Sequence, residues 1–148
     1  MMTTKQKGNL TELQCLAGFV EQGYNVSIPY GEDSKYDFIA DIDGKLIRVQ
    51  VKTSSLKKGT EGAIAFSCRS THKNTQGVSN VRYSSEDVDY FATSWENKIY
   101  LIPIQECSTE KTLRFELPKN GQITNICFAE DYELKNQLKK IKEEVAEH

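Results

Sequence analysis

The clearest hydrophobic pattern lies in residues 36–54, YDFIADIDGKLIRVQVKTS. Apolar and polar residues alternate on both sides of Asp43-Gly44, which is the period of a half-buried β-strand. Asp-Gly suits the type I′ turn of a two-residue hairpin loop. The segment therefore predicts a β-hairpin in which Ile42 pairs with Lys45 and the positions of every later pair have the same sum.

A helical pattern occurs near each end of the chain. Residues 10–22 repeat apolar side chains at the spacing of a buried stripe, with Asn9 as a candidate N-cap and Gly23 as a stop. The stripe consists of Leu13, Leu16, Ala17 and Val20. A charged helix is predicted from about residue 131 to residue 146. Its apolar side consists of Leu134, Leu138, Ile141 and Val145.

Strand patterns recur between these helices. The predicted strands are residues 24–30, 62–70, 89–95, 98–104 and 112–117. Pro29 indicates an edge strand or a strand end, Glu96-Asn97 is a predicted turn, and the polar residues 71–83 predict a long loop. A helix, a run of strands and a closing helix predict a mixed α/β or α+β fold, and we expect one domain over residues 1–148.

The amino-acid composition indicates the broad class of protein. With 38% hydrophobic and 27% charged residues, the chain has the balance of a soluble globular domain. The first ten residues lack the apolar run of a signal peptide, and no segment approaches the length needed to span a bilayer, so we expect a cytoplasmic protein without a membrane partner. The four cysteines form no C-x-x-C pair, which favours buried thiols over a zinc site or a disulfide framework.

The charge distribution indicates a polyanion partner. The net charge is −2, but residues 44–83 hold eight basic groups and one acidic group, a net charge of +7. Residues 1–43 and 84–148 are acidic. A basic block inside an acidic chain favours a surface that binds a polyanion such as DNA.

The polar side of the predicted hairpin collects candidate catalytic groups. The register places Asp37 opposite Gln50, with Lys52 two residues further on the same face. A carboxylate oxygen and an amide oxygen are ligands that Mg²⁺ takes, and the backbone carbonyl of Val51 is a third. Lys52 is a candidate for orienting or deprotonating the attacking water, or for offsetting charge on a phosphate. Without further residues, an ion pair on a solvated sheet face explains the same pattern.

Glu12 is a candidate second carboxylate, and its sequence context allows two interpretations. Asn9 and Glu12 fit a capping box, in which the glutamate returns to the N–H of the cap residue. Glu12 also lies at the edge of the apolar stripe, where its side chain reaches towards a cleft between helix and sheet. The sequence leaves both interpretations open.

Taken together, Glu12, Asp37, Gln50 and Lys52 resemble the active-site pattern of the PD-(D/E)xK nucleases. The chain is most similar to the group I intron-encoded homing endonucleases of that superfamily, whose variant motif has glutamine in place of an acid. The resemblance runs through KGNLTELQ, YDFIADIDGKLIRVQVKTS, DYFAT, YLIPI and CFAEDYEL. Two departures stand out, because Tyr36 replaces the motif proline and Gln50 replaces an anion.

The resemblance implies a restriction-endonuclease-like core with a mixed central sheet flanked by helices. It implies Mg²⁺-dependent hydrolysis of double-stranded DNA at a long site, with Mn²⁺ as a substitute ion. Asp37 would bind the metal, Gln50 and the Val51 carbonyl would assist it, and Glu12 would complete the site. Lys52 would act on the attacking water.

Candidate DNA contacts follow the catalytic strand or lie in the predicted polar loop. Arg, Asn and Gln can read base edges, and lysines hold phosphates. The candidates are Lys57, Lys58, Arg69, His72, Lys73, Asn74, Gln76, Asn80 and Arg82. Cutting both strands requires two active sites, so we expect a homo-oligomer, either a dimer or a dimer of dimers.

Two alternatives share this fold. A structure-selective nuclease, such as a Holliday junction resolvase, would use the same residues on branched DNA. A catalytically idle nuclease fold would serve as a DNA-binding module, with Gln50 marking the loss of the metal site. An unrelated protein-interaction domain would show no salt-dependent DNA affinity, which the basic block predicts.

Overall fold

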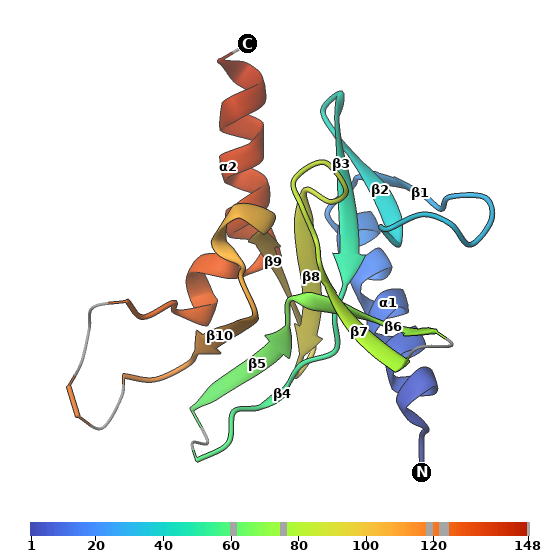
Figure 1. Ribbon diagram of the computed structural model, residues 1–148. Coiled ribbons are helices and arrows are strands. Elements are labelled where there is room, and N and C mark those ends of the chain that lie inside the picture. Colours follow the sequence, from blue (N-terminus) through green and yellow to red (C-terminus); the bar gives the residue numbers. More distant parts are fainter. Residues whose placement is uncertain (60–61, 75–76, 118–119, 122–124, 148) are drawn as a thin grey trace.

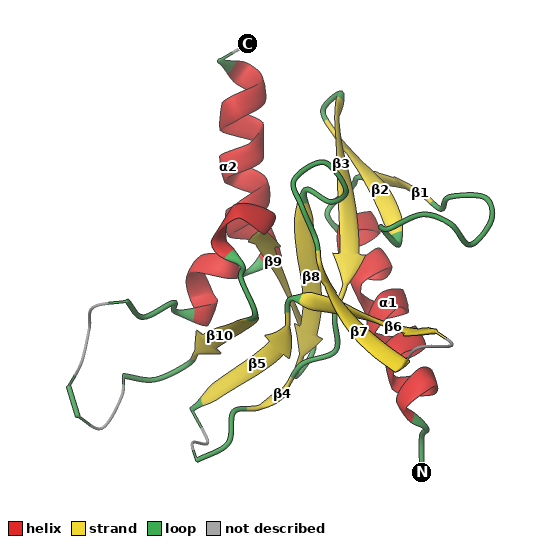
Figure 2. Ribbon diagram, viewed as in Figure 1, coloured by secondary structure: helices red, strands yellow, loops and turns green. Residues whose placement is uncertain are grey.

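The computed structural model describes residues 1–59, 62–74, 77–117, 120–121 and 125–147, and residues 70–82 are described by their backbone alone. Figure 1 labels the elements and Figure 2 separates helices from strands by colour. The helices are α1 (Thr4–Glu21), η1 (Ile104–Glu106), η2 (Ala129–Tyr132) and α2 (Leu134–Ala146). The strands are β1 (Asn25–Ser27), β2 (Phe38–Ile42), β3 (Lys45–Val51), β4 (Ser55–Leu56), β5 (Ala63–Ser67), β6 (Arg69–Asn74), β7 (Gly77–Arg82), β8 (Tyr90–Trp95), β9 (Lys98–Pro103) and β10 (Glu110–Arg114).

The central sheet is mixed and has β3 in its middle. Its strand order is β1-β2-β3-β8-β9. Strands β3 and β8 run parallel, whereas the other neighbouring pairs are antiparallel. The middle position matters because β3 carries Gln50 and Val51, and Lys52 follows it directly.

The turn at Asp43-Gly44 fixes the register of β2 and β3. Both residues have positive φ angles, 52° and 95°, as a type I′ turn requires. The Gly44 N–H also donates to Asp41 Oδ1 at 2.8 Å. Ile42 pairs with Lys45, and the ladder continues to the pair of Phe38 and Val49. The predicted hairpin and its register are confirmed.

Both faces of the central sheet are covered. Helices α1 and α2 pack on one face, against side chains that include Ile47 and Val49. A three-stranded sheet in the order β10-β5-β4 packs on the other face, where Phe91 and Ile102 are buried. The predicted mixed α+β class is confirmed, with the two long helices on one face and a second sheet on the other.

Helix α1 begins at Thr4, well before the hydrophobic pattern predicts. Its N-cap is Thr3, whose side chain accepts a hydrogen bond from the Gln6 N–H at 3.1 Å. The Gln6 side chain accepts from the Thr3 N–H at 2.9 Å, which completes a capping box. The prediction of Asn9 as N-cap is therefore wrong, and Glu12 is not the acid of a capping box because it lies inside the helix.

The buried face of α1 also differs from the predicted stripe. Leu13 and Val20 are 63% and 56% exposed. The buried residues are Thr11, Cys15, Gly18 and Phe19. The helix approaches β9 so closely at Gly18 that an added Cβ atom would lie 2.8 Å from Ile99 Cγ1. Of the predicted stripe, Leu16 packs against the core, whereas Leu13 and Val20 face solvent. The close approach at Gly18 therefore rotates the buried face of α1 away from the predicted stripe.

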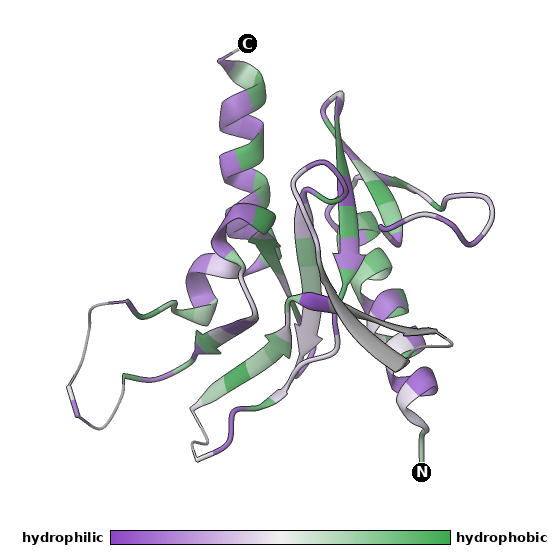
Figure 3. Cartoon of the chain, viewed as in Figure 1, coloured by the Kyte–Doolittle hydropathy of each residue, from purple (hydrophilic) through white to green (hydrophobic). Residues whose placement is uncertain are grey.

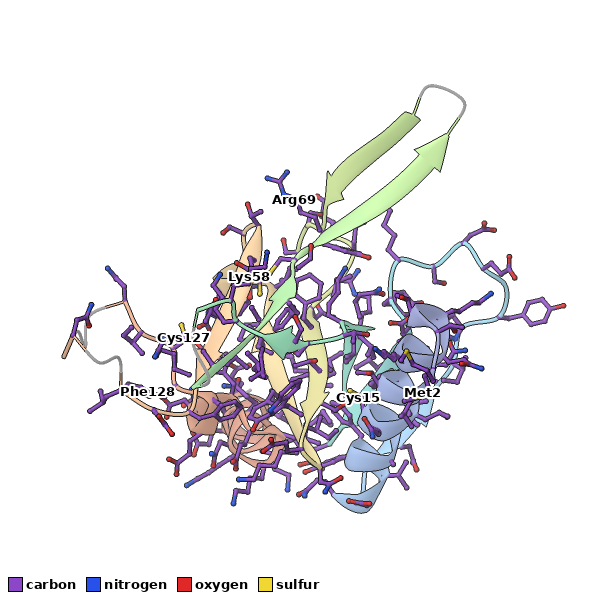
Figure 4. The ribbon with its side chains drawn as sticks, turned by 90° about the horizontal axis from the view of Figure 1, so that it is seen from below. Met2, Cys15, Lys58, Arg69, Cys127 and Phe128 are labelled. Atoms are coloured by element: carbon purple, nitrogen blue, oxygen red, sulfur yellow. The ribbon has the colours of Figure 1, made fainter. Side chains whose placement is uncertain are left out.

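The segment predicted as a polar loop forms a hairpin instead. Strands β6 and β7 pair antiparallel from Arg69 with Arg82 to Asn74 with Gly77. Among the described strands they make a separate two-stranded sheet, and Figure 4 shows this ribbon projecting from the body beyond Arg69. A ribbon outside the core needs no apolar face, so its sequence lacks the alternation that reveals a half-buried strand.

The remaining boundaries shift by a few residues. The predicted strand 24–30 shortens to β1, which is an edge strand of the sheet. The predicted strand 62–70 divides into β5 and the start of β6, and the strand predicted at 112–117 is β10, which begins earlier. The turn between β8 and β9 is confirmed, since Glu96 and Asn97 both have positive φ.

The closing helix follows the predicted pattern. Leu134, Leu138 and Ile141 are buried, and Val145 packs beside them. Figure 3 shows the resulting green bands recurring along α2. No helix in the described part of the chain is long and apolar enough to cross a membrane.

The cysteines are free thiols, as predicted. Cys15, Cys68 and Cys107 are buried, and Cys127 is partly buried. Within the residues that the structure describes, no group of three or more His, Cys, Asp or Glu side chains has the arrangement of a metal site.

The contact at Gly18 gives a test of how α1 is seated. Gly18→Leu should lower the free energy of unfolding by about 1–3 kcal/mol, because the new side chain overpacks the contact with Ile99 and Leu134. Ala17→Leu is the matched control, since the neighbouring residue is exposed. Urea denaturation followed by circular dichroism measures both variants. Equal stabilities for the two leucine variants would show that α1 does not pack as described.

Candidate active site

Asp37 lies where strands β2 and β3 separate. The regular ladder ends with Phe38 and Val49. Beyond it, the Asp37 N–H donates to the Val49 carbonyl at 2.8 Å, and the Val51 N–H donates to Asp37 Oδ2 at 2.7 Å. The carboxylate thus takes the place of a strand partner, and it is held beside the last residue of β3. The predicted pair of Asp37 and Gln50 lies one step beyond the ladder.

Gln50 is partly buried near the end of β3 and pairs in register with Phe91 of β8. Its neighbours Val49 and Val51 turn towards the helical core, so Gln50 faces the opposite side of the sheet. The Gln50 amide has no hydrogen-bond partner among the described residues. Its oxygen is therefore available to a ligand.

Lys52 follows β3, and its backbone is held by a hydrogen bond from its N–H to the Ala92 carbonyl at 2.8 Å. Its Nζ donates to the Arg69 carbonyl at 2.9 Å and lies 4.8 Å from the centroid of the Tyr83 ring. Burial lowers the pKa of Lys52, and the neighbouring Cys68 and Asp37 oppose that shift. Lys52 and Asp37 therefore interact electrostatically.

Helix α1 brings Glu12 to the same place from the other side of the sheet. Glu12 is partly buried in the middle of the helix. Burial raises its pKa, and the negative charge of Asp37 raises it further. Burial likewise raises the pKa of Asp37, against the opposing effects of the Val51 N–H and Lys52. The structure thus brings Glu12, Asp37 and Lys52 together at the end of β3.

The oxygen atoms of Glu12, Asp37 and Gln50 are of a chemical type that suits a divalent cation. Two carboxylates and an amide oxygen are hard ligands of the type that Mg²⁺ and Mn²⁺ take. Glu12 has no hydrogen bond or ion pair among the described residues, and its charge is disfavoured by the nearby Asp37. A cation between two partly buried acids would remove that repulsion. The Val51 carbonyl belongs to the same strand end.

An ion pair that sequence reasoning missed braces β3 against β8. Arg48 Nη2 lies 3.1 Å from Asp89 Oδ1, and Arg48 Nε and its backbone N–H both donate to Asp89 Oδ2, at 3.1 and 2.8 Å. The Asp89 N–H returns a bond to the Arg48 carbonyl at 3.0 Å. Alternation already places Arg48 on the face of Gln50, but nothing in the sequence pairs it with an acid in a distant turn.

The candidate DNA contacts lie in three settings. Lys57 forms an ion pair with Glu110 at 2.6 Å, so part of its charge is used inside the protein. Lys58 is exposed. Arg69 is partly buried at the base of the hairpin, where its Nη2 lies 3.4 Å from Thr109 Oγ1. His72, Lys73, Asn74, Asn80 and Arg82 belong to β6 and β7, where the backbone alone is described, and Gln76 lies outside the described residues.

Asp37, just before β2, and Lys52, just after β3, are both partly buried and flank the central hairpin of a mixed sheet, as in restriction-endonuclease-like nucleases. The chain belongs to the PD-(D/E)XK endonuclease family, whose sequence model matches residues 2–135. The family resemblance read from the motif residues is thereby confirmed, and the chain is a nuclease.

A solved structure agrees with this fold. The structure of a bacterial homing endonuclease, I-Ssp6803I, matches 99% of this chain over 99% of its own, with a TM-score of 0.78 and 23% sequence identity. At that identity the similarity concerns the fold. The comparison with curated proteins gives no match.

The brace between β3 and β8 predicts a specific dependence of stability on pH. Burial alone would raise the pKa of Asp89, but the hydrogen bonds and charge of Arg48 hold it below its ordinary value. The ionised carboxylate therefore stabilises the fold above its unfolded pKa of about 3.9, and this contribution is lost as the pH falls through the lower folded pKa. Asp89→Asn should lower the thermal midpoint at pH 7 and make its decline in acid less steep.

The exposed acid Asp33, in the loop between β1 and β2, gives the matched control. Asp33→Asn should leave the midpoint at pH 7 close to that of the parent protein. Calorimetric scans from pH 7 to about pH 3 compare the three proteins. A midpoint for Asp89→Asn that follows the parent at every pH would mean that the brace carries no stability.

Proposed function

We propose that this nuclease is a Mg²⁺-dependent, site-specific endonuclease that cuts double-stranded DNA, of the homing-endonuclease type. The observation that carries the proposal is the meeting of Glu12, Asp37 and Lys52 at the end of β3. The fold shared with a bacterial homing endonuclease supports the same type.

The proposed ligand set is Asp37, Glu12, the amide oxygen of Gln50 and the backbone carbonyl of Val51. Asp37 is held in place by the Val51 N–H, so it needs little reorganisation to bind an ion. When bound, Mg²⁺ supplies a Lewis acid that activates water and offsets phosphate charge. Mn²⁺ is the expected substitute.

Lys52 is proposed as the catalytic amine. Its pKa is lowered by burial, which makes the neutral amine more accessible than in an exposed lysine. The amine can then accept a proton from the attacking water, and the ammonium form offsets charge on the reacting phosphate.

DNA is proposed to lie along the β6–β7 hairpin. A two-stranded ribbon fits the major groove, and this ribbon projects from the body (Figure 4). It belongs to the segment with a net charge of +7. Cutting both strands needs two active sites, so we propose a homo-oligomer, a dimer or a dimer of dimers.

The catalytic role of Lys52 can be tested directly. Lys52→Met should abolish cleavage and leave DNA affinity within about twofold, because one lysine among many contributes little to phosphate binding. Lys139→Met is the matched control, since Lys139 is exposed on α2. The assay follows cutting of a randomised linear duplex library with Mg²⁺, and gel shift without divalent metal measures affinity.

Two outcomes would contradict the proposal. If Lys52→Met cuts DNA at the parent rate, Lys52 is not the catalytic amine. A parent protein that cuts a four-way junction but no linear duplex is instead a structure-selective nuclease.

A second prediction concerns the effect of Gln50 on metal affinity. Gln50→Glu should bind Mn²⁺ several-fold more tightly, because a third carboxylate adds charge to the ligand set. Gln105→Glu is the matched control at an exposed position and should leave the affinity unchanged. Isothermal calorimetry with Mn²⁺ measures both. Absence of binding by the parent protein and by Gln50→Glu would favour an idle nuclease fold.

A further inference from the structure

Both ends of the projecting hairpin reach the side chain of Lys52. The Arg69 carbonyl, at the first residue of β6, accepts a hydrogen bond from Lys52 Nζ at 2.9 Å. The Tyr83 ring, one residue after the end of β7, lies with its centroid 4.8 Å from the same nitrogen. Two residues far from Lys52 in the chain therefore hold its ammonium group.

The two contacts come from a single structural unit. Arg69 pairs with Arg82 at the base of the hairpin, and Tyr83 follows Arg82 directly. Because the described strands of the hairpin pair with no other sheet, a movement of the ribbon is not resisted by a strand ladder. The base of the ribbon, where Lys52 is bound, contacts the body through Arg69 and Tyr83.

The backbone of Lys52 is fixed, but its side chain is long enough to reach several positions. The hydrogen bond to Ala92 anchors the main chain at the end of β3. Four rotatable bonds separate that anchor from Nζ, so the surroundings of the nitrogen decide where the charge lies. Those surroundings include Phe91, whose ring centroid lies 5.7 Å from Nζ. The Phe91 ring packs edge-on against the Tyr83 ring, with 5.4 Å between the two centroids.

We propose that the base of the β6–β7 hairpin positions Lys52 for catalysis, with Tyr83 as the positioning residue and the Arg69 carbonyl as the hydrogen-bond acceptor. The proposal rests on the nuclease function proposed above and adds a regulation of that site. DNA binding on the hairpin is thereby coupled to the position of Lys52 Nζ, so a duplex that binds the hairpin poorly is cut slowly.

A simpler role for Tyr83 makes a different prediction. If the ring only fills space beside Phe91, an aliphatic replacement that keeps the fold also keeps the cleavage rate. If the ring positions Lys52, the same replacement slows the chemical step, because a leucine side chain has no π face to hold an ammonium group.

The experiment compares Tyr83→Leu and Tyr83→Phe with the parent protein. Tyr30→Leu is the control, because Tyr30 is fully exposed in the loop between β1 and β2. The substrate is a plasmid carrying the duplex that the parent protein selects from a randomised library. Single-turnover cleavage at saturating enzyme reports the chemical step, and gel shift without divalent metal reports DNA affinity.

We expect Tyr83→Leu to lower the single-turnover rate by roughly tenfold to a hundredfold, the scale of a misplaced catalytic group. Its DNA affinity should stay within about twofold, because the ring contacts Lys52 and carries no charge to bind phosphate. Tyr83→Phe should restore the rate, since it keeps the ring. A parent rate in Tyr83→Leu, or a loss confined to DNA affinity, overturns the proposal.

A second measurement does not depend on cleavage. Reductive methylation followed by mass spectrometry reports how accessible Lys52 Nζ is in the folded protein. Tyr83→Leu should speed modification of Lys52 several-fold, and Tyr83→Phe should not. If the parent protein cuts no DNA, the proposed function fails, and the methylation rates then decide alone whether Tyr83 holds Lys52. Equal rates in all variants overturn the positioning role.

Discussion

The hydrogen bond from the Val51 N–H to the Asp37 carboxylate is the constraint on which the site depends. It forms where the β2–β3 ladder has ended, so a side chain does what a backbone carbonyl does in the ladder. Without it, the end of β3 would lose a partner for a backbone donor. With it, the strands separate and a fixed carboxylate remains in the gap. Gln50 and Lys52 flank the residue that donates this bond, so their positions follow from the same contact.

Burial favours the uncharged form of all three ionisable groups of the site. It raises the pKa of Glu12 and of Asp37 and lowers that of Lys52, so each group is charged at some cost in the metal-free protein. An acid in place of Gln50 would add a third partly buried negative charge and increase that cost. In the proposed metal site, the glutamine would keep an oxygen ligand without the charge, which would favour the stability of the metal-free fold at the expense of metal affinity. The brace of Arg48 and Asp89 stabilises the strand that carries this unfavourable arrangement.

The hairpin that builds the site could be predicted from the sequence because its constraints are local. Asp43-Gly44 requires positive φ at both positions, and strand alternation then fixes which residues share a face. The rotation of α1 could not be predicted in this way, because it depends on how closely Gly18 approaches β9. The capping box at Thr3 shows that Glu12 is not a capping residue. The sequence could not decide this, because Thr3, Thr4 and Asn9 are all suitable N-caps before Glu12. The aromatic and carbonyl contacts of Lys52 are long-range, and they follow from the path of a hairpin that has no apolar period.

The basic block of residues 44–83 divides once the fold is known. Arg48 is committed to Asp89, and Lys57 is paired with Glu110, so neither presents its full charge to a polyanion. Lys52 is turned towards the base of the hairpin. The positive charge left for a polyanion therefore lies on Lys58, Arg69 and the basic residues of the β6 and β7 strands. In the proposed function, DNA recognition on the ribbon and catalysis at the end of β3 would then meet where Arg69 and Tyr83 contact Lys52.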